Sequence, residues 1–173
     1  MPRFTFDDNN TSDVWAAEIL WIHRLKGAFF LNDKPGIEYD VENLLRYGMV
    51  VGNHTAHHIR INEATPQQIV DEVLSFNDKL ISLGASGEWF SYPFSSGSHS
   101  LIYDTFKYIY RGYDTEQPDK DGEISRVTVT KKSLETVLSY TKPLQLHGIE
   151  TGQWMDMSRG DFITICQKYA QNQ

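Results

Sequence analysis

Short apolar segments alternate with longer amphipathic segments along most of the chain, and this alternation limits the fold more than any other feature of the sequence. A strand followed by a helix, repeated several times, is typical of α/β proteins whose sheet is largely parallel. The predicted strands span residues 3–6, 28–31, 49–52, 88–92, 108–113, 124–129 and 143–149. The pattern therefore predicts an α/β protein, and the alternation alone fits a closed barrel and an open sheet equally well.

Glycines and capping residues mark the ends of the predicted helices. Residues 65–68 (TPQQ) supply an N-cap, a first-turn proline and a capping-box partner. Gly27, Gly48 and Gly84 each follow an amphipathic segment, and Gly27 is expected to stop its helix in the left-handed conformation. The predicted helices span residues 14–26, 37–47, 66–83, 100–108 and 158–170, with a short helix after Ser133.

Charge and composition exclude several kinds of partner. The 173 residues carry a formal net charge of −7 without any long basic run, which argues against nucleic acid and anionic membranes and favours a small neutral or cationic substrate. No apolar run approaches the roughly 20 residues of a membrane-spanning helix. The single cysteine, Cys166, excludes an internal disulfide and is expected in the core. We expect one domain over residues 1–173. Because no secretory signal precedes the first strand, we expect a cytoplasmic protein, with an extracellular or cell-wall location as the alternative if the sequence is part of a longer one.

Polar side chains gather where predicted strands end. Asp7 and Asp8 follow the first strand, residues 52–58 (GNHTAHH) follow the third, residues 91–94 (SYPF) end the fourth, and His147 ends the last. The carboxyl ends of parallel strands meet at one edge of the sheet, where α/β folds place their functional groups. The sequence therefore predicts one site assembled from four strand exits.

The types of these residues indicate a metal centre. His54 and His58 lie four positions apart, so one helical turn would place both on the same face. Two imidazoles and one carboxylate form a ligand set that suits zinc hydrolysis or non-haem iron chemistry and leaves positions for water and substrate. A second carboxylate can take a proton from bound water, and a histidine on the other side can return one. We therefore predict that one of Asp7 and Asp8 binds a metal ion and the other acts as the base.

Each of these residues also has an ordinary structural interpretation. Asp7 and Asp8 would cap the next helix, although residues 11–13 (TSD) are better placed to do so. The histidines would form a solvated loop, and the zincin motif is absent because Thr55 stands where its glutamate would be. His147 alone would be a buried structural histidine. The histidines to which we assign no role are His23 and His99.

Four motifs of the chain together resemble a known family. The motifs FTFDD, HTxxH (His54 to His58), FSYPF and LHG occur in this order and resemble those of the NodB-type polysaccharide deacetylases, carbohydrate esterase family 4. The resemblance extends from residue 4 to about residue 150. It implies an α/β fold of the distorted (β/α)7 barrel type. It also implies hydrolysis of N- or O-acetyl groups on sugars such as chitin oligomers, peptidoglycan, poly-N-acetylglucosamine and xylan.

The resemblance assigns roles to the residues at the strand exits. It implies that Asp8, His54 and His58 are the metal ligands, that Asp7 is the general base and that His147 is the general acid. The ion of the family is usually Zn²⁺, and Co²⁺ and other divalent ions are also accepted.

The third motif implies both a wall of the groove and a first departure from the family. Tyr92, Pro93 and Phe94 would form this wall, with the backbone N–H of Phe94 facing the oxyanion. Many members carry an arginine at the position of Ser91 to hold the base, so the chain resembles the variant form found in some poly-N-acetylglucosamine deacetylases.

Two further departures affect the later motifs. Gln145 stands where the family has the leucine of the acetyl pocket. The tryptophan-containing fourth motif is not recognisable in residues 108–129, which leaves Asp114 as a candidate partner for the general acid. A degraded pseudoenzyme would be expected to lose some of the five residues named above as ligands, base and acid, and all five are present.

These observations lead to a main hypothesis and an alternative. The main hypothesis is a metal-dependent hydrolase that removes acetyl groups, in the first place N-acetyl groups, from an amino-sugar polysaccharide or oligosaccharide. The alternative, motivated by the missing arginine and by Gln145, is a catalytically silent carbohydrate-binding module on the same barrel. The aromatic residues considered for stacking on sugar rings are Trp89, Tyr92, Phe94, Tyr113 and Trp154. A non-haem iron oxygenase is a more distant third, because the second aspartate has no role there.

One more residue is predicted to complete the site. The base needs a partner to fix its rotamer, and Ser91 cannot supply a bidentate fork. Two arginines, Arg111 and Arg126, lie near later strands. Arg126 occupies the place where similar variant deacetylases carry a proline-arginine pair, so we predict that it pairs with Asp7 from the opposite side of the site. The alternative is a solvated arginine at a strand start.

Overall fold

The described residues form a closed parallel barrel. The computed structural model describes residues 1–129, 132–150 and 157–171. Seven strands within these ranges pair in chain order, and β1 also pairs with β7, so the sheet closes and the barrel rather than the open sheet is confirmed. The strands are β1 Phe4–Asp7, β2 Gly27–Leu31, β3 Val50–Asn53, β4 Trp89–Ser91, β5 Tyr108–Tyr113, β6 Glu123–Thr128 and β7 Leu144–Leu146.

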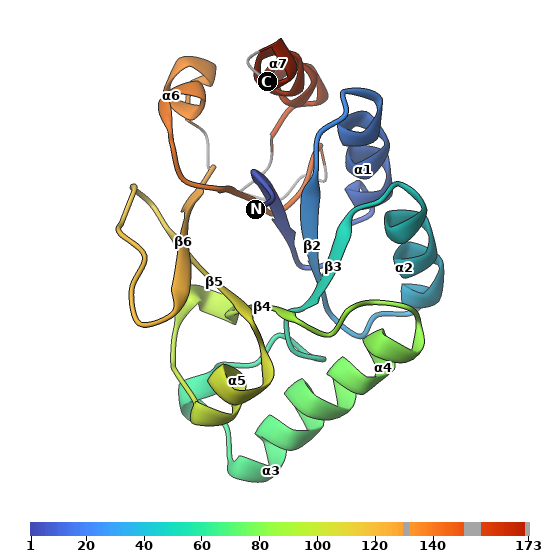
Figure 1. Ribbon diagram of the computed structural model, residues 1–173, viewed down its shortest axis with the longest axis vertical. Helices are drawn as coiled ribbons and strands as arrows, with labels where there is room; N and C mark the ends of the chain where they lie inside the picture. The colour runs from blue at the N-terminus through green and yellow to red at the C-terminus, as the bar shows by residue number, and fades with distance from the viewer. Residues whose placement is uncertain (130–131, 151–156, 172–173) are drawn as a thin grey trace.

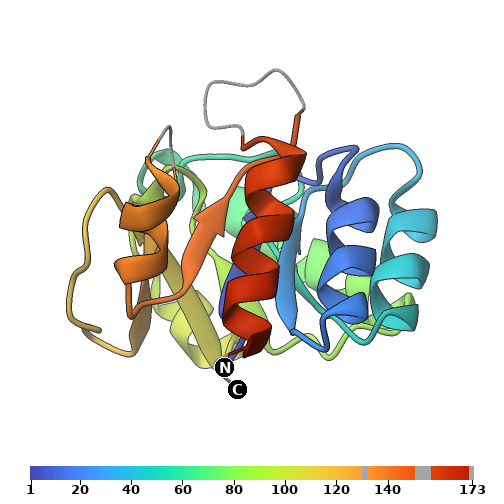
Figure 2. The same ribbon diagram turned by 90° about the horizontal axis from the view of Figure 1, so that it is seen from above.

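Helices cover the outside of the barrel. Figure 1 shows α6, α7, α1 and α2 following one another around the strands, and Figure 2 shows the same four helices side by side. None of the described helices has the length and apolar character that crossing a membrane requires. The helices are α1 Asp13–Ile22, α2 Ile37–Arg46, α3 Pro66–Ile69, α4 Phe76–Ser82, α5 Ser100–Thr105, α6 Leu134–Ser139 and α7 Arg159–Gln171.

Strand alternation separates the core from the site. Phe4 and Phe6 of β1 are buried and pack against Phe162 of α7, with ring centroids 6.0 and 5.8 Å apart. Because neighbouring side chains of a strand point to opposite faces, Thr5 and Asp7 lie inside the barrel. The outer layer between strands and helices thus forms the main core, which also contains the buried thiol of Cys166 as expected.

The barrel interior has an aromatic part and a polar part. Trp89 stacks on both Tyr108 and Tyr110, and Tyr110 also contacts Phe30. The polar side chains at the carboxyl ends of the strands lie above this stack, since the guanidinium of Arg126 is 5.3 Å from the Phe30 ring. Trp89 is therefore a partly buried residue packed against these tyrosines, and it does not line the groove that holds the site.

Most of the predicted helix ends are confirmed, and the predicted end of the first helix is wrong, as is that of the helix over 100–108. Gly48 and Gly84 follow α2 and α4 with φ of 70° and 103°. By contrast, α1 ends at Ile22, Arg24 adopts the positive φ of 58°, and Gly27 opens β2. A Cβ at Gly27 would lie 2.7 Å from Leu20 Cδ1, so this glycine is required by the close approach of α1 to the strand.

The long helical segment between β3 and β4 also follows its sequence signals. Thr65 and Gln68 form the predicted capping box, and α3 and α4 are joined by a π-helical stretch over Val70–Ser75. The predicted helix over 100–108 is shorter, because α5 ends at Thr105 and Tyr108 already belongs to β5. Strands β5 and β6 are parallel although only residues 114–122, without a helix, join them.

Candidate metal centre and active site

The two aspartates leave β1 in different directions. Asp7 is the last strand residue and points into the barrel, whereas Asp8 and Asn9 adopt φ of 77° and 50°. A positive φ costs a non-glycine residue roughly 1–2 kcal/mol, so the surroundings must hold this turn. Lys34 does so by donating hydrogen bonds to the backbone carbonyls of Asp8 and Asn9. The turn brings the Asp8 carboxylate to the mouth of the barrel.

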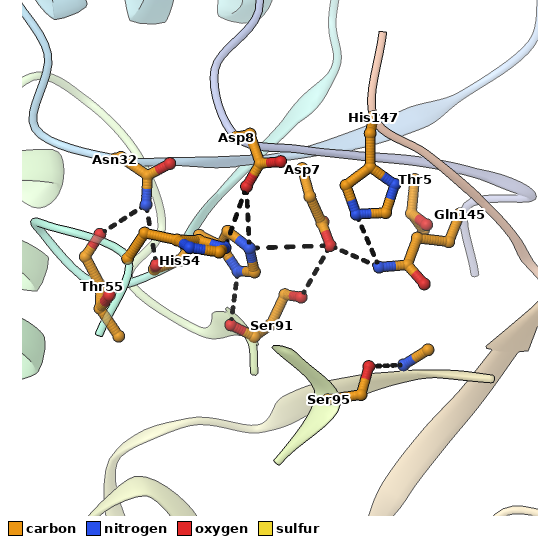
Figure 3. A network of polar contacts seen from close by, with 12 residues as sticks. Thr5, Asp7, Asp8, Asn32, His54, Thr55, Ser91, Ser95, Gln145 and His147 are labelled. Carbon is orange, nitrogen blue, oxygen red and sulfur yellow. Dashed lines mark hydrogen bonds and ion pairs between the residues drawn. The ribbon is translucent and has the colours of Figure 1, made fainter. Parts of the chain in front are cut away.

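His54 and His58 follow β3 in a loop and not, as predicted, on one helical turn. Thr55 and His58 adopt φ of 61° and 55°. The side-chain amide of Asn32 donates hydrogen bonds of 2.9 Å to the carbonyls of both His54 and Thr55, which fixes the loop (Figure 3). The two imidazoles nevertheless lie together, with ring centroids 4.9 Å apart.

Three possible metal-ligand atoms converge at this point. Asp8 Oδ1 lies 3.4 Å from His54 Nε2 and 3.1 Å from His58 Nε2. His54 Nδ1 is 2.8 Å from the carbonyl oxygen of Ser91, to which it must donate, so His54 Nε2 carries a lone pair. Burial alone would raise the pKa of Asp8, but the imidazoles of His54 and His58 outweigh it and the pKa is lowered.

This donor set fits a divalent metal ion. The three ligand atoms lie within 4.8 Å of one another, and Asp8 Oδ1 is buried without a hydrogen-bond donor. Two imidazole nitrogens and one carboxylate oxygen are the ligands of zinc and of other transition metals, with room for water or substrate at the open positions. Asp8, His54 and His58 are thus the described residues that would hold an ion.

Asp7 is held by the arginine that the sequence pointed to. Arg126 is only 1% exposed, and its Nη1 donates a hydrogen bond of 2.8 Å to Asp7 Oδ1 while its Nη2 donates to Asp7 Oδ2. Nη1 also donates to Thr5 Oγ1 at 3.1 Å. The predicted pairing is present, and the alternative of a solvated arginine is excluded. Burial alone would raise the pKa of Asp7, but the charge of Arg126 contributes most to lowering it.

Ser91 and Gln145 complete the surroundings of Asp7. The small side chain of Ser91 accepts a hydrogen bond from Arg126 Nη2 and lies 3.4 Å from Asp7 Oδ2. Gln145 Nε2 donates to Asp7 Oδ2 at 2.8 Å, and its Oε1 accepts from Thr128 at 2.8 Å. The two departures from the family motifs therefore meet at one carboxylate, as Figure 3 shows in part.

A glycine on β5 makes room for Gln145. A Cβ at Gly112 would lie only 1.7 Å from Gln145 Oε1. Sequence reasoning missed this requirement, because nothing in the sequence shows that these two residues lie side by side.

His147 lies on the other side of Asp7 from His54 (Figure 3). Its Nε2 is 3.4 Å from Gln145 Nε2, and its buried Nδ1 has no hydrogen-bond partner among the described residues. Asp114, the candidate partner of this histidine, lines the same groove without bonding to the ring, so that prediction is wrong. Burial lowers the pKa of His147, and the charges of Asp7 and Asp8 oppose this effect in part.

The predicted wall of the groove comes from the loop after β4. Tyr92 is buried, and Pro93 begins a short 3₁₀ turn in which Phe94 has a φ of 54°. The Phe94 ring is 51% exposed and lies 4.5 Å from the His58 ring, with the Arg60 guanidinium 4.0 Å away. The Phe94 N–H donates to no acceptor among the described residues. Of the other aromatic candidates, Tyr113 lines the groove and Trp154 lies outside the described residues.

The three possible metal ligands, Asp7 and His147 all face one groove of about 510 Å³. It is lined by Asp7, Asp8, His54, His58, Tyr92, Phe94, Ser95, Gly112, Tyr113, Asp114, Thr128, Gln145 and His147. The histidines without an assigned role lie elsewhere, and His99 caps α5 by accepting a hydrogen bond from the Leu101 N–H.

Comparison with known proteins gives a consistent result. The family model described as polysaccharide deacetylase matches residues 3–113, and no curated protein matches the chain.

Three similar solved structures share the fold at low sequence identity. The first is the Bc1960 peptidoglycan N-acetylglucosamine deacetylase, with a TM-score of 0.71, 15% identity, and coverage of 98% of this chain and 80% of that one. A family 4 acetyl xylan esterase from Clostridium thermocellum, solved with a cobalt ion, has a TM-score of 0.68, 14% identity, and coverage of 98% and 82%. A family 4 pseudoenzyme from Bacillus anthracis has a TM-score of 0.62, 14% identity, and coverage of 99% and 62%.

Proposed function

The chain belongs to the polysaccharide deacetylase family, and from this premise we propose that it is a metal-dependent hydrolase that removes acetyl groups, in the first place N-acetyl groups, from an amino-sugar polymer or oligomer. The observation that carries the proposal is the convergence of a metal-binding triad, a buried second carboxylate and a histidine in one groove. Each of these groups has a task in amide hydrolysis.

Asp8, His54 and His58 would hold the ion, with zinc or cobalt the first choices. A bound ion would polarise the acetyl carbonyl and lower the pKa of a water molecule. Asp8 Oδ1 and the two Nε2 atoms would be its ligands, because the tautomer fixed at His54 turns the lone pair of Nε2 toward the Asp8 carboxylate, with His58 Nε2 on the same oxygen.

Asp7 would act as the general base. Its Oδ2 lies 3.8 Å from His54 Nε2, which makes this oxygen the nearest group to take a proton from a water beside the ligand set. The lowered pKa of Asp7 keeps the carboxylate ionised and ready to accept. Arg126, Gln145 and Ser91 fix its rotamer, so that little ordering is left to the reaction itself.

Groups on the other sides of the groove would stabilise the oxyanion and protonate the leaving group. Water oxygen bonds to the acetyl carbon, and the free N–H of Phe94 is the described backbone donor available for the oxygen that gains charge. When the carbon–nitrogen bond breaks, His147 would return a proton to the amine nitrogen. The products are acetate and the free amino sugar, which balances the amide and water consumed.

The alternative, a silent carbohydrate-binding module, loses part of its motivation. It was based on a missing arginine, and Arg126 supplies a guanidinium to Asp7 from β6 instead. Binding of chito-oligomers without acetate release would still favour it.

The test is an acetate-release assay on acetylated chito-oligomers, with 4-nitrophenyl acetate as a second substrate. The protein is stripped with a chelator and then reloaded with zinc or cobalt. We expect release that disappears on stripping, returns on reloading and is lost in Asp7→Asn. No release from any substrate with either ion, or full activity in Asp7→Asn, would contradict the proposal.

A further inference from the structure

The loop that carries Phe94 has a strained backbone. Phe94 and Ser95 adopt φ of 54° and 49°, and Gly97 has φ of 81°. Two consecutive non-glycine residues with positive φ cost roughly 1–3 kcal/mol each, so the surrounding structure must fix the loop. Gly97 is also confined, because a Cβ there would lie 2.7 Å from the backbone nitrogen of Asn62.

Arg111 of β5 fastens this loop from outside the barrel. Its Nη1 donates to the carbonyl oxygen of Ser95 and its Nη2 to that of Gly97, both at 2.7 Å. The guanidinium lies over the ring of Tyr92, 4.3 Å from the centroid. The next residue, Gly112, adds a bond of 3.0 Å from its N–H to Ser95 Oγ. Arg111 thus contacts the loop at Tyr92, Ser95 and Gly97.

Glu123 of β6 holds the guanidinium in this position. Its two carboxylate oxygens accept bonds of 2.6 Å from Arg111 Nε and Nη2, a bidentate arrangement that fixes the plane of the fork. Tyr103 of α5 donates to the same carboxylate at 2.7 Å. Both side chains of the pair are about nine-tenths buried, at 12% and 10% exposure. Neither Arg111 nor Glu123 lines the groove itself.

We propose that Arg111 is a positioning residue, which together with Glu123 holds the Phe94 N–H where the acetyl oxygen gains charge. This inference rests on the proposed function. Beyond Phe94, the carbonyl oxygens of Ser95 and Gly97 accept hydrogen bonds from Arg111. The Phe94 N–H itself has no partner among the described residues. A donor that is free and rigidly aimed stabilises the transition state without reordering at the moment of reaction.

A merely structural role of the pair predicts something different. Arg111 and Glu123 also lie on paired strands, so they staple β5 to β6. In that case their removal would lower the stability of the barrel and the amount of active protein, but each folded molecule would keep its turnover number.

The experiment compares Arg111→Ala, Arg111→Lys and Glu123→Gln with the control Lys107→Met, which removes an exposed cation next to the same strand. Acetate release from chito-oligomers is measured with the zinc-loaded protein and normalised to the folded fraction. We expect kcat of Arg111→Ala to fall about 10- to 100-fold with KM within about 2-fold, because a small displacement of a fixed group costs this much. Added guanidinium ion should restore part of the kcat. Glu123→Gln should show a smaller loss, and Lys107→Met should match the wild type.

Hydrogen–deuterium exchange supplies a second measurement that does not depend on activity. The amides of residues 94–97 should exchange about 10-fold faster in Arg111→Ala, with the β1 and β3 amides unchanged and zinc affinity within about 2-fold of wild type. Exchange unchanged over 94–97, or a kcat that follows only the folded fraction, would overturn the inference. If the wild type releases no acetate, the proposed function fails, and exchange still decides whether Arg111 holds the loop.

Discussion

The two sides of the site are built in different ways. On the β1–β3 side, the three proposed metal ligands follow their strands, and two of the three come from one five-residue stretch, 54–58. On the β4–β7 side, the residues around Asp7 come from strands far apart in the chain. Arg126 is 119 positions from Asp7, Gln145 is 138 and Ser91 is 84. The first side is a local motif, and the second exists only once the barrel has closed.

The two sides also differ in how their polar groups are satisfied. The ligand side is strained, with positive φ at Asp8 and His58, and it leaves Asp8 Oδ1 without a donor. On the other side, both oxygens of the Asp7 carboxylate have partners. This contrast indicates that the ligand side depends on an ion to be complete, whereas the base is already held by protein groups.

The largest effect is expected from removing the cation beside Asp7. Arg126→Met leaves the buried carboxylate of Asp7 without its main partner, which should lower the free energy of unfolding by about 3–5 kcal/mol and abolish turnover. Urea unfolding and acetate release measure the two effects. The double variant Asp7→Asn/Arg126→Met is the control and should recover a large part of the stability. If Arg126→Met alone unfolds like the wild type, the β4–β7 side does not hold the base as described.

A smaller effect is expected at Gln145. Gln145→Leu keeps a side chain of similar size but removes the hydrogen bond to the Asp7 carboxylate and the one from Thr128, so the free energy of unfolding should fall by about 1–2 kcal/mol. Gln145→Glu should be more destabilising, because it places a carboxylate oxygen where the amide nitrogen now lies, 2.8 Å from Asp7 Oδ2, and like charges at this distance repel each other. Urea unfolding of both variants checks this order. The reverse order would contradict the assigned amide orientation.

The β1–β3 side of the site was more predictable from the sequence than the β4–β7 side. Asp7, Asp8, His54 and His58 could be placed together from the sequence, because strand exits in a parallel fold meet at one edge. The matching family model likewise covers residues 3–113 and stops before β6 and β7. Beyond that point, the placement of His147 in the site and the pairing of Arg126 with Asp7 were predicted. The contacts of Gln145, Gly112, Arg111 and Glu123 depend on the register of strands around a closed barrel, and no local pattern encodes that register.

The remaining features were predictable only where they depend on residues close together in the sequence. The capping box at Thr65 was predictable, since it uses residues three positions apart. The end of α1 was not, because Gly27 is required by its contact with Leu20 and not by a helix terminus. The fourth motif could not be found in residues 108–129, and the structure accordingly gives His147 Nδ1 no aspartate partner among the described residues.

The smallest expected effect concerns Asp13, near the ligand side, and has the opposite sign. Asp13 is buried, its Oδ1 has no donor, and burial raises its pKa well above the usual value. The folded state therefore binds this proton more tightly than the unfolded state, so Asp13 costs increasing stability as the pH rises above about 3.8, the ordinary value. Asp13→Asn keeps an acceptor for the Asn10 N–H and should raise the free energy of unfolding at pH 7 by up to about 1 kcal/mol.

Urea unfolding of Asp13→Asn at several pH values provides the check. The gain should shrink as the pH is lowered and vanish below about pH 4, where the carboxyl is protonated in both states. A gain that is independent of pH, or a loss at pH 7, would show that the charge of Asp13 is compensated.

If the ligand side and the base-holding side are separable, metal binding must depend on Asp8 and not on Asp7. Zinc binding is measured by calorimetry on the wild type, Asp8→Asn, and Asp7→Asn, the last two being the same change at adjacent positions. We expect Asp8→Asn to lose about 100-fold or more in zinc affinity, and Asp7→Asn to bind zinc within a few-fold of the wild type. Equal loss in both variants would contradict the separation of the two aspartates into a metal ligand and a base.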